Sequence, residues 1–552
     1  MYNPTQLITI IREIELNLSA ISTSRKYVLE NNTFSLMINL KKLVLFEKSY
    51  ADFTLIKIQN DSLKGLKNLE ELKIGNCLIK EANFCFDFPN LKKLELFISF
   101  YRTSNVVFSN LSNLVELNFG CDLNCLESDD NLFSNLSNLK ILHLKLKNIN
   151  SNFFKDLTQL KELHITKTNL YENNSTCIIH KDAFKGLVNL IKLKLSNCKF
   201  LESNLFEDLI SLKKLSLSFS SINLDEQFFN GLSNLERLHL EDINFIHKNE
   251  DFFQNLINLK EIKSNLEIIS MLPNNRLKNI QKLKILGNYE SIQNRLTKIE
   301  LNNLNCLHLL DIKYDLDLKM FKKLEKLDEL KLRIKEDNSS RIESVINFER
   351  LSLKHFHMSV NTNLFQDLIN LTSLNLSLGS ISFHATCDLF SNLSNLKHLD
   401  LSSMDRVDLD NKVFSNLSKL EVLSLTMIRD LSINELSFYG LANLKILNLS
   451  YNGLFYLKAN ILKHMINLVD LNLNSCKLSS IHDNAFNGLS KLQRLNLSLN
   501  SIDNISVKDL SQLTSLKYLN LYQNPFIYRM EILKFYNDLN NNDLNLIIDV
   551  EE

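Results

Sequence analysis

The chain has 552 residues, with 63 Lys and Arg balanced by 63 Asp and Glu, so its formal net charge is zero. Hydrophobic residues make up 45% and charged residues 23%, which is enough apolar material for a large core and too little charge for disorder. The chain has no excess of basic residues, so its overall charge does not indicate binding to nucleic acid or to an anionic membrane. Only 10 Gly and 4 Pro occur, so chain reversals of the usual kind are few.

Residues 1–30 are predicted to form an amino-terminal cap or a degenerate repeat. Ile11, Ile14 and Leu16 already show a spacing that recurs downstream. The apolar stretch around them spans about five residues before Arg12, which is too short for the hydrophobic region of a secretory signal. No apolar run approaches the roughly 20 residues of a membrane span. If Met1 is the true start, the sequence predicts neither a secretory signal nor a membrane span.

Residues 31–524 repeat the pattern Leu-x-x-Leu-x-Leu. The clearest copies begin 24 residues apart, at Leu420, Leu444, Leu468, Leu492 and Leu516. Upstream copies, one of them placed at Leu307, bring the total to about 22 units. The alternation with period 2 predicts a short strand in each unit, and the apolar positions three apart predict a tight return.

Two further apolar columns accompany the strands. A Phe stands six residues before the first Leu of many units, as at Phe154 and Phe184, and a Leu stands three residues before it, as at Leu187. One unit cannot bury its own apolar side, so neighbouring units must stack and share a core.

The stretch Leu468–Leu478 reads Leu-Val-Asp-Leu-Asn-Leu-Asn-Ser-Cys-Lys-Leu and is followed by Phe486 and Leu489. It resembles the leucine-rich repeat family, in the 24-residue typical class found in Toll-like receptor ectodomains. The resemblance covers about nine-tenths of the chain. It implies an α/β-type repeat solenoid, curved as a horseshoe, with a parallel β-sheet on the concave face. Short turns or 3-10 segments are then expected on the convex face.

The Asn of the family pattern is only partly present. Asn452, Asn500 and Asn524 match it, and Cys77, Cys198 and Cys476 occupy the same position, whereas other units carry Lys147, Thr168, Ser220 or Gly379. A buried Asn or thiol can bond to backbone groups of the adjacent turn, but a Lys cannot stay buried. We therefore expect looser turns in the amino-terminal half.

Two regions depart from the regular repeat. Residues 259–348 lack the Phe column and have unit spacings of 20–27 residues, which favours decayed repeats over a functional kink. Residues 525–552 are predicted to form a short carboxy-terminal cap, with Met530 and Leu533 on one helical face and a strand-like Leu544–Ile548. No cysteine follows Cys476, so the disulfide cap of extracellular family members is not expected.

No common catalytic or phosphate-binding signature occurs in the sequence, so no enzyme activity, cofactor or metal site is predicted. Cys121 and Cys125 form the closest cysteine pair, and a zinc site needs two more ligands at compatible spacing.

Between the last two Leu of each strand lies a residue that points away from the core. We call these residues the outward column. Because parallel strands lie about 4.8 Å apart, the column is expected to form a ladder on the exposed sheet face. Its first half is basic and rich in His, and its second half is rich in amides. The candidate partner-binding residues are Lys73, His143, His164, Lys194, His239, Lys263, Asn448, Asn472, Asn496 and Asn520.

Two groups within the outward column have alternative interpretations. His143 and His164 are predicted neighbours that can clamp an anion when protonated or offer two metal ligands, although solvated surface residues are favoured. The four Asn residues can hydrogen-bond along the column, which is favoured, or contact a peptide through their amides. His355 and His357 are interpreted as surface residues.

The resemblance implies a non-catalytic protein–protein interaction scaffold that binds a protein partner on the concave face. The balanced charge predicts no nucleic acid partner, and the lack of a long apolar run predicts no membrane span. One alternative is a secreted or receptor-derived ligand-binding ectodomain. A second is the substrate-recognition subunit of an enzyme complex. The sequence does not indicate the oligomeric state.

Two observations bear on the compartment. Nine scattered cysteines favour reduced thiols and a cytoplasmic location. Acceptor tripeptides for N-glycosylation, as at Asn110, Asn135, Asn392 and Asn416, favour an extracellular location if the amino terminus is incomplete.

Overall fold

The computed structural model divides into two compact units, Met1–Ile280 and Gln281–Glu552. It describes residues 13–17, 26–46, 55–59, 61–79, 87–98, 108–121, 132–146, 148–166, 176–200, 204–218, 227–243, 250–286, 301–312, 324–334, 349–354, 365, 368–378, 382–384, 389–409, 412–503, 505, 510, 512–525 and 545–547. Lys147, Thr168, Ser220, Gly379, Cys125, His355, His357 and the predicted helical face of the carboxy-terminal cap lie outside the described residues.

Unit 1 is a coil of short parallel strands. Its strands are β1 (Glu13–Asn17), β2 (Lys26–Leu29), β3 (Lys42–Phe46), β4 (Leu55–Ile58), β5 (Glu71–Ile79), β6 (Lys93–Ile98), β7 (Glu116–Cys121), β8 (Ile141–Lys145), β9 (Asn148–Ile149), β10 (Glu162–Thr166), β11 (Cys177–Ile179), β12 (Lys192–Ser196), β13 (Cys198–Phe200), β14 (Lys214–Ser218), β15 (Arg237–Glu241) and β16 (Glu261–Asn265).

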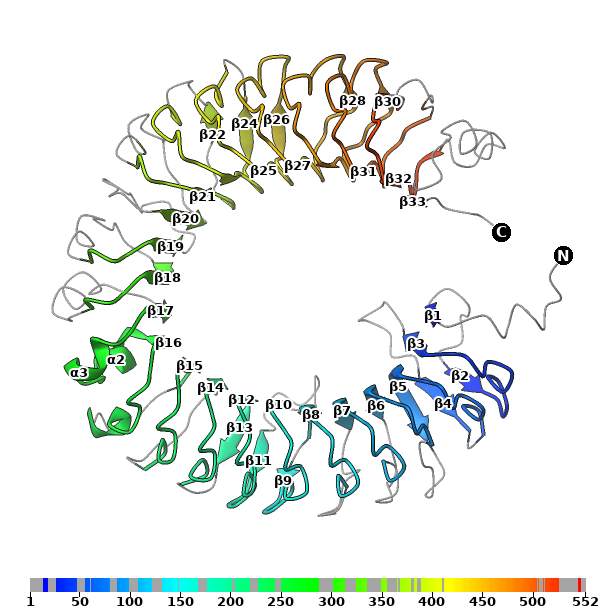
Figure 1. The fold of residues 1–552 in the computed structure, drawn as a ribbon, viewed down its shortest axis with the longest axis vertical. Helices are drawn as coiled ribbons and strands as arrows, with labels where there is room; N and C mark the ends of the chain where they lie inside the picture. The colour runs from blue at the N-terminus through cyan, green and yellow to red at the C-terminus, as the bar shows by residue number, and fades with distance from the viewer. Residues whose placement is uncertain are drawn as a thin grey trace. The chain divides into compact units, whose positions relative to one another are not determined.

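The main sheet of unit 1 joins successive coils in register. It runs β1-β3-β5-β6-β7-β8-β10-β12-β14-β15-β16, with every described pair parallel. A second sheet, β13-β11-β9, forms on the turn side, and β2 pairs with β4. In Figure 1 the main strands lie on the inner side of the curve of this unit, and the turns lie on its outer side.

Unit 2 repeats this design with shorter strands. Its strands are β17 (Lys282–Leu286), β18 (Cys306–Ile312), β19 (Glu329–Ile334), β20 (Arg350–Lys354), β21 (Ser373–Asn375), β22 (Ser382–His384), β23 (His398–Asp400), β24 (Arg406–Asp408), β25 (Val422–Ser424), β26 (Asp430–Ser432), β27 (Ile446–Asn448), β28 (Tyr456–Leu457), β29 (Asp470–Asn472), β30 (Ser480–Ile481), β31 (Arg494–Asn496), β32 (Tyr518–Asn520) and β33 (Asn545–Ile547).

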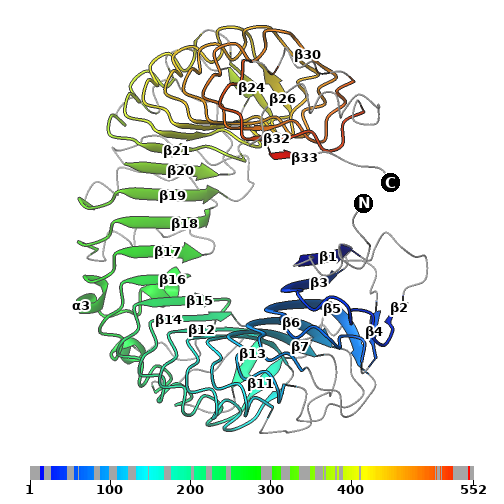
Figure 2. The same cartoon turned by 45° about the vertical axis from the view of Figure 1, so that its right-hand side comes forward.

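The main sheet of unit 2 is also parallel throughout its described pairs. It runs β17-β18-β19-β20-β21-β23-β25-β27-β29-β31-β32-β33. Figure 2 shows the strands from β17 to β21 side by side. Small sheets β22-β24-β26 and β28-β30 lie on the turn side (Figure 1). Leu307 pairs with Leu283 and Leu330, which makes it the second leucine of its unit. The unit start placed at Leu307 is therefore wrong, and Leu304 holds that position. The solenoid predicted from the repeat is confirmed.

Alternate side chains of each strand fill the core. In β10, Leu163 and Ile165 are fully buried, whereas Glu162, His164 and Thr166 are partly exposed. Buried Phe side chains stack from coil to coil, because the Phe column repeats with the strands. The rings of Phe154 and Phe184 are 6.0 Å apart and 10° from parallel. The predicted core of Leu and Phe columns is confirmed.

The irregular region does not lack the Phe column completely, because Phe321, which lies outside the described residues, stands six residues before Leu327. In the unit after β16, however, no Phe occupies this position, and two short helices lie there instead. They are α2 (Leu266–Ile269) and α3 (Asn274–Leu277), preceded by the 3-10 helix η2 (Glu250–Phe253). Asn265 caps α2 by accepting a hydrogen bond from the backbone N–H of Ile268 at 2.9 Å. Buried Leu266, Ile268 and Ile269 supply the apolar contacts there.

Buried Asn side chains complete the turns of unit 2, as predicted from the family pattern. Nδ2 of Asn500 donates to the carbonyls of Leu473 and Leu497 at 2.9 and 2.8 Å. Its Oδ1 accepts from the backbone N–H of Cys476 and Leu478 at 2.8 and 3.1 Å. In the preceding coil, Cys476 occupies the position that Asn500 holds in its coil. The thiol of Cys476 donates to the carbonyl of Leu449 at 3.0 Å.

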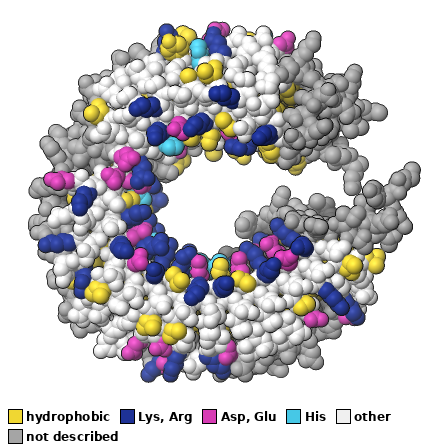
Figure 3. Space-filling view, viewed as in Figure 1, with side chains coloured by type: hydrophobic (Ala, Val, Ile, Leu, Met, Phe, Trp, Pro, Cys, Tyr) yellow, Lys and Arg dark blue, Asp and Glu magenta, His cyan; other side chains and the backbone are white. Residues whose placement is uncertain are grey.

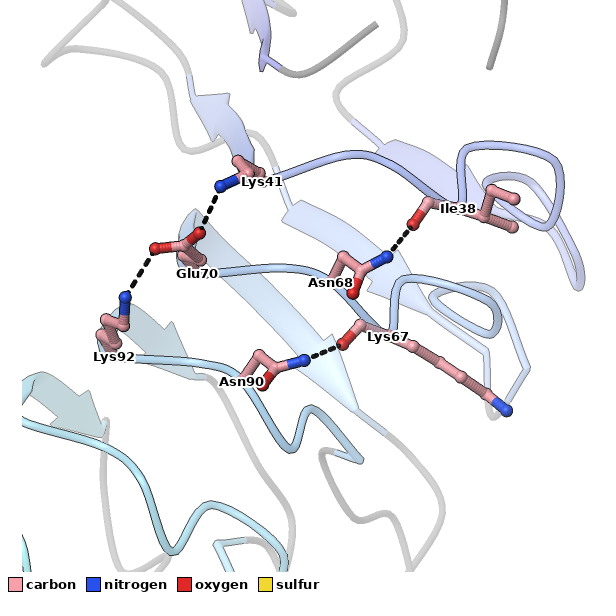
Figure 4. A network of polar contacts seen from close by, with 7 residues as sticks. All are labelled: Ile38, Lys41, Lys67, Asn68, Glu70, Asn90 and Lys92. Carbon is pink, nitrogen blue, oxygen red and sulfur yellow. Dashed lines mark hydrogen bonds and ion pairs between the residues drawn. The ribbon is translucent and has the colours of Figure 1, made fainter. Parts of the chain in front are cut away.

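A second Asn column, immediately before the first Leu, links turns in both units. Nδ2 of Asn68 donates to the Ile38 carbonyl, and Nδ2 of Asn90 donates to the Lys67 carbonyl, both at 2.9 Å (Figure 4). The same bond to the preceding coil recurs at Asn113, Asn138, Asn189, Asn234, Asn258, Asn395, Asn443 and Asn467. Sequence analysis missed this column, although it lies beside the leucines that define the repeat.

Replacing Asn500 with Ala is expected to destabilise the chain by about 3 kcal/mol, because buried backbone groups of two coils lose their hydrogen bonds. Replacing Asn467, whose bond to the Ala442 carbonyl lies at the exposed surface, should cost about 1 kcal/mol. Urea unfolding of both variants tests this difference. Equal midpoints would show that the buried Asn column does not stabilise the turns more than the exposed one.

Replacing Phe154 with Ala should cost about 3–5 kcal/mol, because its buried ring stacks between Phe133 and Phe184 and leaves a cavity. Ile210, which is 55% exposed on a turn, provides the control, and Ile210→Ala should change stability by less than about 0.5 kcal/mol. Thermal unfolding measures both. A Phe154→Ala variant as stable as the control would contradict a continuous Phe core.

Candidate functional site

The outward column of unit 1 forms the predicted ladder on the sheet face. Strand register places side by side, in order, Lys73, Glu95, Asn118, His143, His164, Lys194, Ser216, His239 and Lys263. Because these residues share one position of each strand, their Cα atoms follow the sheet at the spacing of the strands. The six candidate residues of the amino-terminal half therefore lie on one surface.

Acidic side chains are interleaved with the basic ones on this surface. Lys73 pairs with Glu95 at 3.1 Å, Lys192 with Glu162 at 2.6 Å, and Lys263 with Glu241. At the edge of the same face, Glu70 bridges Lys41 and Lys92 at 2.8 and 2.7 Å (Figure 4). Figure 3 shows the alternation of both charge types along the strand-bearing side of unit 1. The face is thus a lattice of ion pairs and not a uniformly basic patch.

His143 and His164 stack face to face. Their ring centroids are 4.3 Å apart and the planes differ by 3°. Burial lowers the pKa of both imidazoles, that of His164 to about 4, where the neighbouring His143 and Lys194 add to the effect. Both rings are therefore neutral at pH 7, so an anion clamp requires acidic conditions. Because the rings are parallel, their nitrogen lone pairs lie in parallel planes and do not converge on one metal ion.

In unit 2, Asn448, Asn472, Asn496 and Asn520 lie side by side in the outward column. Their Oδ1 atoms accept from the backbone N–H two residues later, at 3.1, 3.0, 3.1 and 3.0 Å. This local bond is an Asx-turn that competes with the next bond of the ladder, and the four strands that carry these residues, β27, β29, β31 and β32, are each three residues long. The favoured interpretation, hydrogen bonding along the column, is wrong for these four oxygens.

A mixed cluster of Cys306, His308 and Glu329 lies on the same face near the start of unit 2. Nε2 of His308 is 3.2 Å from Sγ of Cys306 and 3.2 Å from Oε1 of Glu329. Lys331 pairs with the same Oε1 at 2.6 Å. His308 and Lys331 stand between the last two leucines of their strands and so belong to the outward column as defined from the sequence, but the sequence analysis did not associate Cys306 and Glu329 with them. The Cys-x-His spacing on one strand was the available signal.

Burial and charge set the protonation of this cluster. Burial lowers the pKa of His308, assisted by Lys331, so its imidazole is neutral at pH 7. Burial raises the pKa of the Cys306 thiol to about 11, and the Glu329 charge adds to this. Burial also opposes ionisation of Glu329, but hydrogen bonds from Lys331 and His308 outweigh it and leave that pKa below its usual value.

No helix among the described residues has the length and apolar character needed to cross a membrane. Cys177, Cys198, Cys306 and Cys476 are buried free thiols.

Comparison with known proteins agrees with this architecture. The profile of the BspA type leucine rich repeat region matches residues 27–161, 177–301 and 341–431, and a leucine rich repeat profile matches residues 466–526. Among solved structures, that of a TLR13–ssRNA13 complex is similar in fold, with a TM-score of 0.52 and 21% identity over 97% of this chain and 94% of that one. No curated protein matches. With family profiles matching well over half of its length, the chain belongs to the leucine-rich repeat family.

Proposed function

We propose that this chain is a non-catalytic recognition protein that binds a protein partner on the strand-bearing face of unit 1. The observation that supports this most directly is the in-register ladder from Lys73 to Lys263. Its side chains stand on strands whose opposite face is fully buried, so the surface is rigid before binding. A rigid surface loses little conformational freedom on association.

The alternation of charges favours a protein over a polyanion. Carboxylates such as Glu95, Glu162 and Glu241 stand between the basic residues and pair with them. A nucleic acid backbone presents only negative charge and is bound by neutralising phosphates with unpaired Lys and Arg. The structurally similar TLR13 is seen in complex with ssRNA13, which makes RNA the alternative ligand that the experiment must exclude.

The test is a charge-reversal variant in which His143, His164 and Lys194 are all replaced with Glu. Because both histidines are neutral at pH 7, this variant changes the net charge by four. The matched control, Lys155→Glu with Lys185→Glu, also changes it by four, but on exposed turns of the same unit. Proteins captured from an extract of the source cells by the wild-type chain should be lost with the face variant, by at least about tenfold in affinity.

Retention of the captured partner by the face variant, with loss in the turn variant, would contradict the proposal. Thermal unfolding of both variants shows whether the fold is intact. Fluorescence anisotropy with a single-stranded RNA oligonucleotide should show no binding at physiological salt. RNA binding that the face variant abolishes would replace the protein partner with RNA.

For the compartment we propose the cytosol, supported by the four buried free thiols. The opposing observation is that Asn110, Asn135, Asn392 and Asn416 are all exposed on turns, where a glycan can be attached. Electrophoresis of the natively expressed protein, before and after enzymatic removal of N-glycans, should show no shift. A shift would favour the receptor-type ectodomain instead. A third interpretation, the substrate-recognition subunit of an enzyme complex, predicts an enzyme among the captured proteins.

A further inference from the structure

The geometry points to a metal site in unit 2, where we propose that Cys306, His308 and Glu329 bind one Zn²⁺ ion. Their ligand atoms lie within 4.8 Å of one another. The donor set of one thiol, one imidazole and one carboxylate is the type that zinc prefers. This inference does not depend on the proposed protein partner.

The separations of the ligand atoms already approach those of a zinc site. Zn–S bonds of about 2.3 Å and Zn–N or Zn–O bonds of about 2.0–2.2 Å place tetrahedral ligand atoms roughly 3.3–3.6 Å apart. Sγ of Cys306 and Oε1 of Glu329 each lie 3.2 Å from Nε2 of His308. The third pair, Sγ of Cys306 and the Glu329 carboxylate, lies within 4.8 Å, so a side-chain rotation that brings these two groups closer completes the geometry.

The backbone of the sheet fixes this arrangement. Cys306 and His308 are two residues apart on β18, so their side chains point to the same face. Glu329 lies directly opposite Cys306 on β19. Two paired strands thus supply all three ligands, and the side chains of His308 and Glu329 are each only 14% exposed.

The donor set, and not the surrounding charge, favours zinc over harder cations. Lys282 and Lys284 lie opposite Cys306 and His308 on β17, and Lys331 pairs with Glu329. Arg350 lies 3.6 Å from the other oxygen of Glu329. These cations repel a metal ion unless a thiolate and a carboxylate neutralise it, and Mg²⁺ or Ca²⁺ binds oxygen ligands in preference to sulfur. The side chain of Lys331 is 48% exposed, so its ammonium can turn to solvent when the ion binds.

Unit 1 contains a matched site that differs mainly at the cysteine. There β15 and β16 place Arg237, His239, Glu261 and Lys263 in the same register as Cys306, His308, Glu329 and Lys331. The His239 Nε2 to Glu261 Oε1 distance is also 3.2 Å. With Arg237 in place of the thiol, this site has two ligands and an added positive charge, so it should not hold zinc.

Three protein ligands leave the fourth position of a tetrahedral zinc ion open. Because the cluster lies on the sheet face, that position is directed toward solvent and can be filled by water or by a ligating side chain of a bound molecule. Such a site would give unit 2 a point of attachment chemically distinct from the ion pairs of unit 1.

The experiment is a titration of the reduced full-length chain with Zn²⁺ by calorimetry, compared with Cys306→Ser, His308→Gln and the control His239→Gln. Wild type and His239→Gln should bind one equivalent of Zn²⁺ at this site. Cys306→Ser and His308→Gln should not bind this equivalent. Mg²⁺ should not bind at the site. Comparison with Cys306→Ser isolates this site from any other thiols that bind zinc.

Titration with Co²⁺ gives a second readout that a structural role of the cysteine would not produce. A sulfur-to-cobalt charge-transfer absorption is expected in wild type and His239→Gln, and it should be lost in Cys306→Ser. Circular dichroism melts of the metal-free variants show whether each one is folded. Equal zinc stoichiometry and an unchanged cobalt spectrum in folded Cys306→Ser would overturn the proposal.

Discussion

The structure depends on one constraint: the backbone groups of every turn must find hydrogen-bond partners in the neighbouring coil. Short strands satisfy only part of the backbone, and an unpaired buried group costs about 1–3 kcal/mol. Side-chain amides supply the missing partners. Asn500 does so inside the coil, and Asn68 does so at the turn surface. The two Asn columns therefore join the turns of successive coils.

Core packing and turn hydrogen bonds are made by other residues, so the outward side chains of each strand are not needed for the core. Leu and Phe side chains hold the coils together, and the amides complete the turns, so the outward residues can vary without loss of the fold. In unit 1 they form paired charges around two stacked histidines. In unit 2 they form the Cys306 cluster and a row of Asx-turns. Recognition is therefore the function that the architecture leaves free to diversify.

The solenoid, the strands and the Phe core were predictable from the sequence because they follow from a short period of apolar residues. The position of Asn500 was also predictable, because the family pattern includes it. The column of Asn68 was not recognised, because Asn is also frequent in the loops and the regular spacing of this column does not stand out. The cluster at Cys306 was missed for a different reason. Glu329 is one strand away, and only the register between β18 and β19 brings it to His308.

The most direct test of this account is amide hydrogen exchange, measured by mass spectrometry, at the turns of unit 2. The N–H groups of Ile428, Cys476, Leu478 and Ile502 donate to the Oδ1 atoms of buried Asn residues. If side-chain amides complete the coil, these N–H groups should exchange as slowly as those of β29 and β31. Exchange as rapid as that of an exposed loop would contradict the claim that the Asn columns hold the coils together.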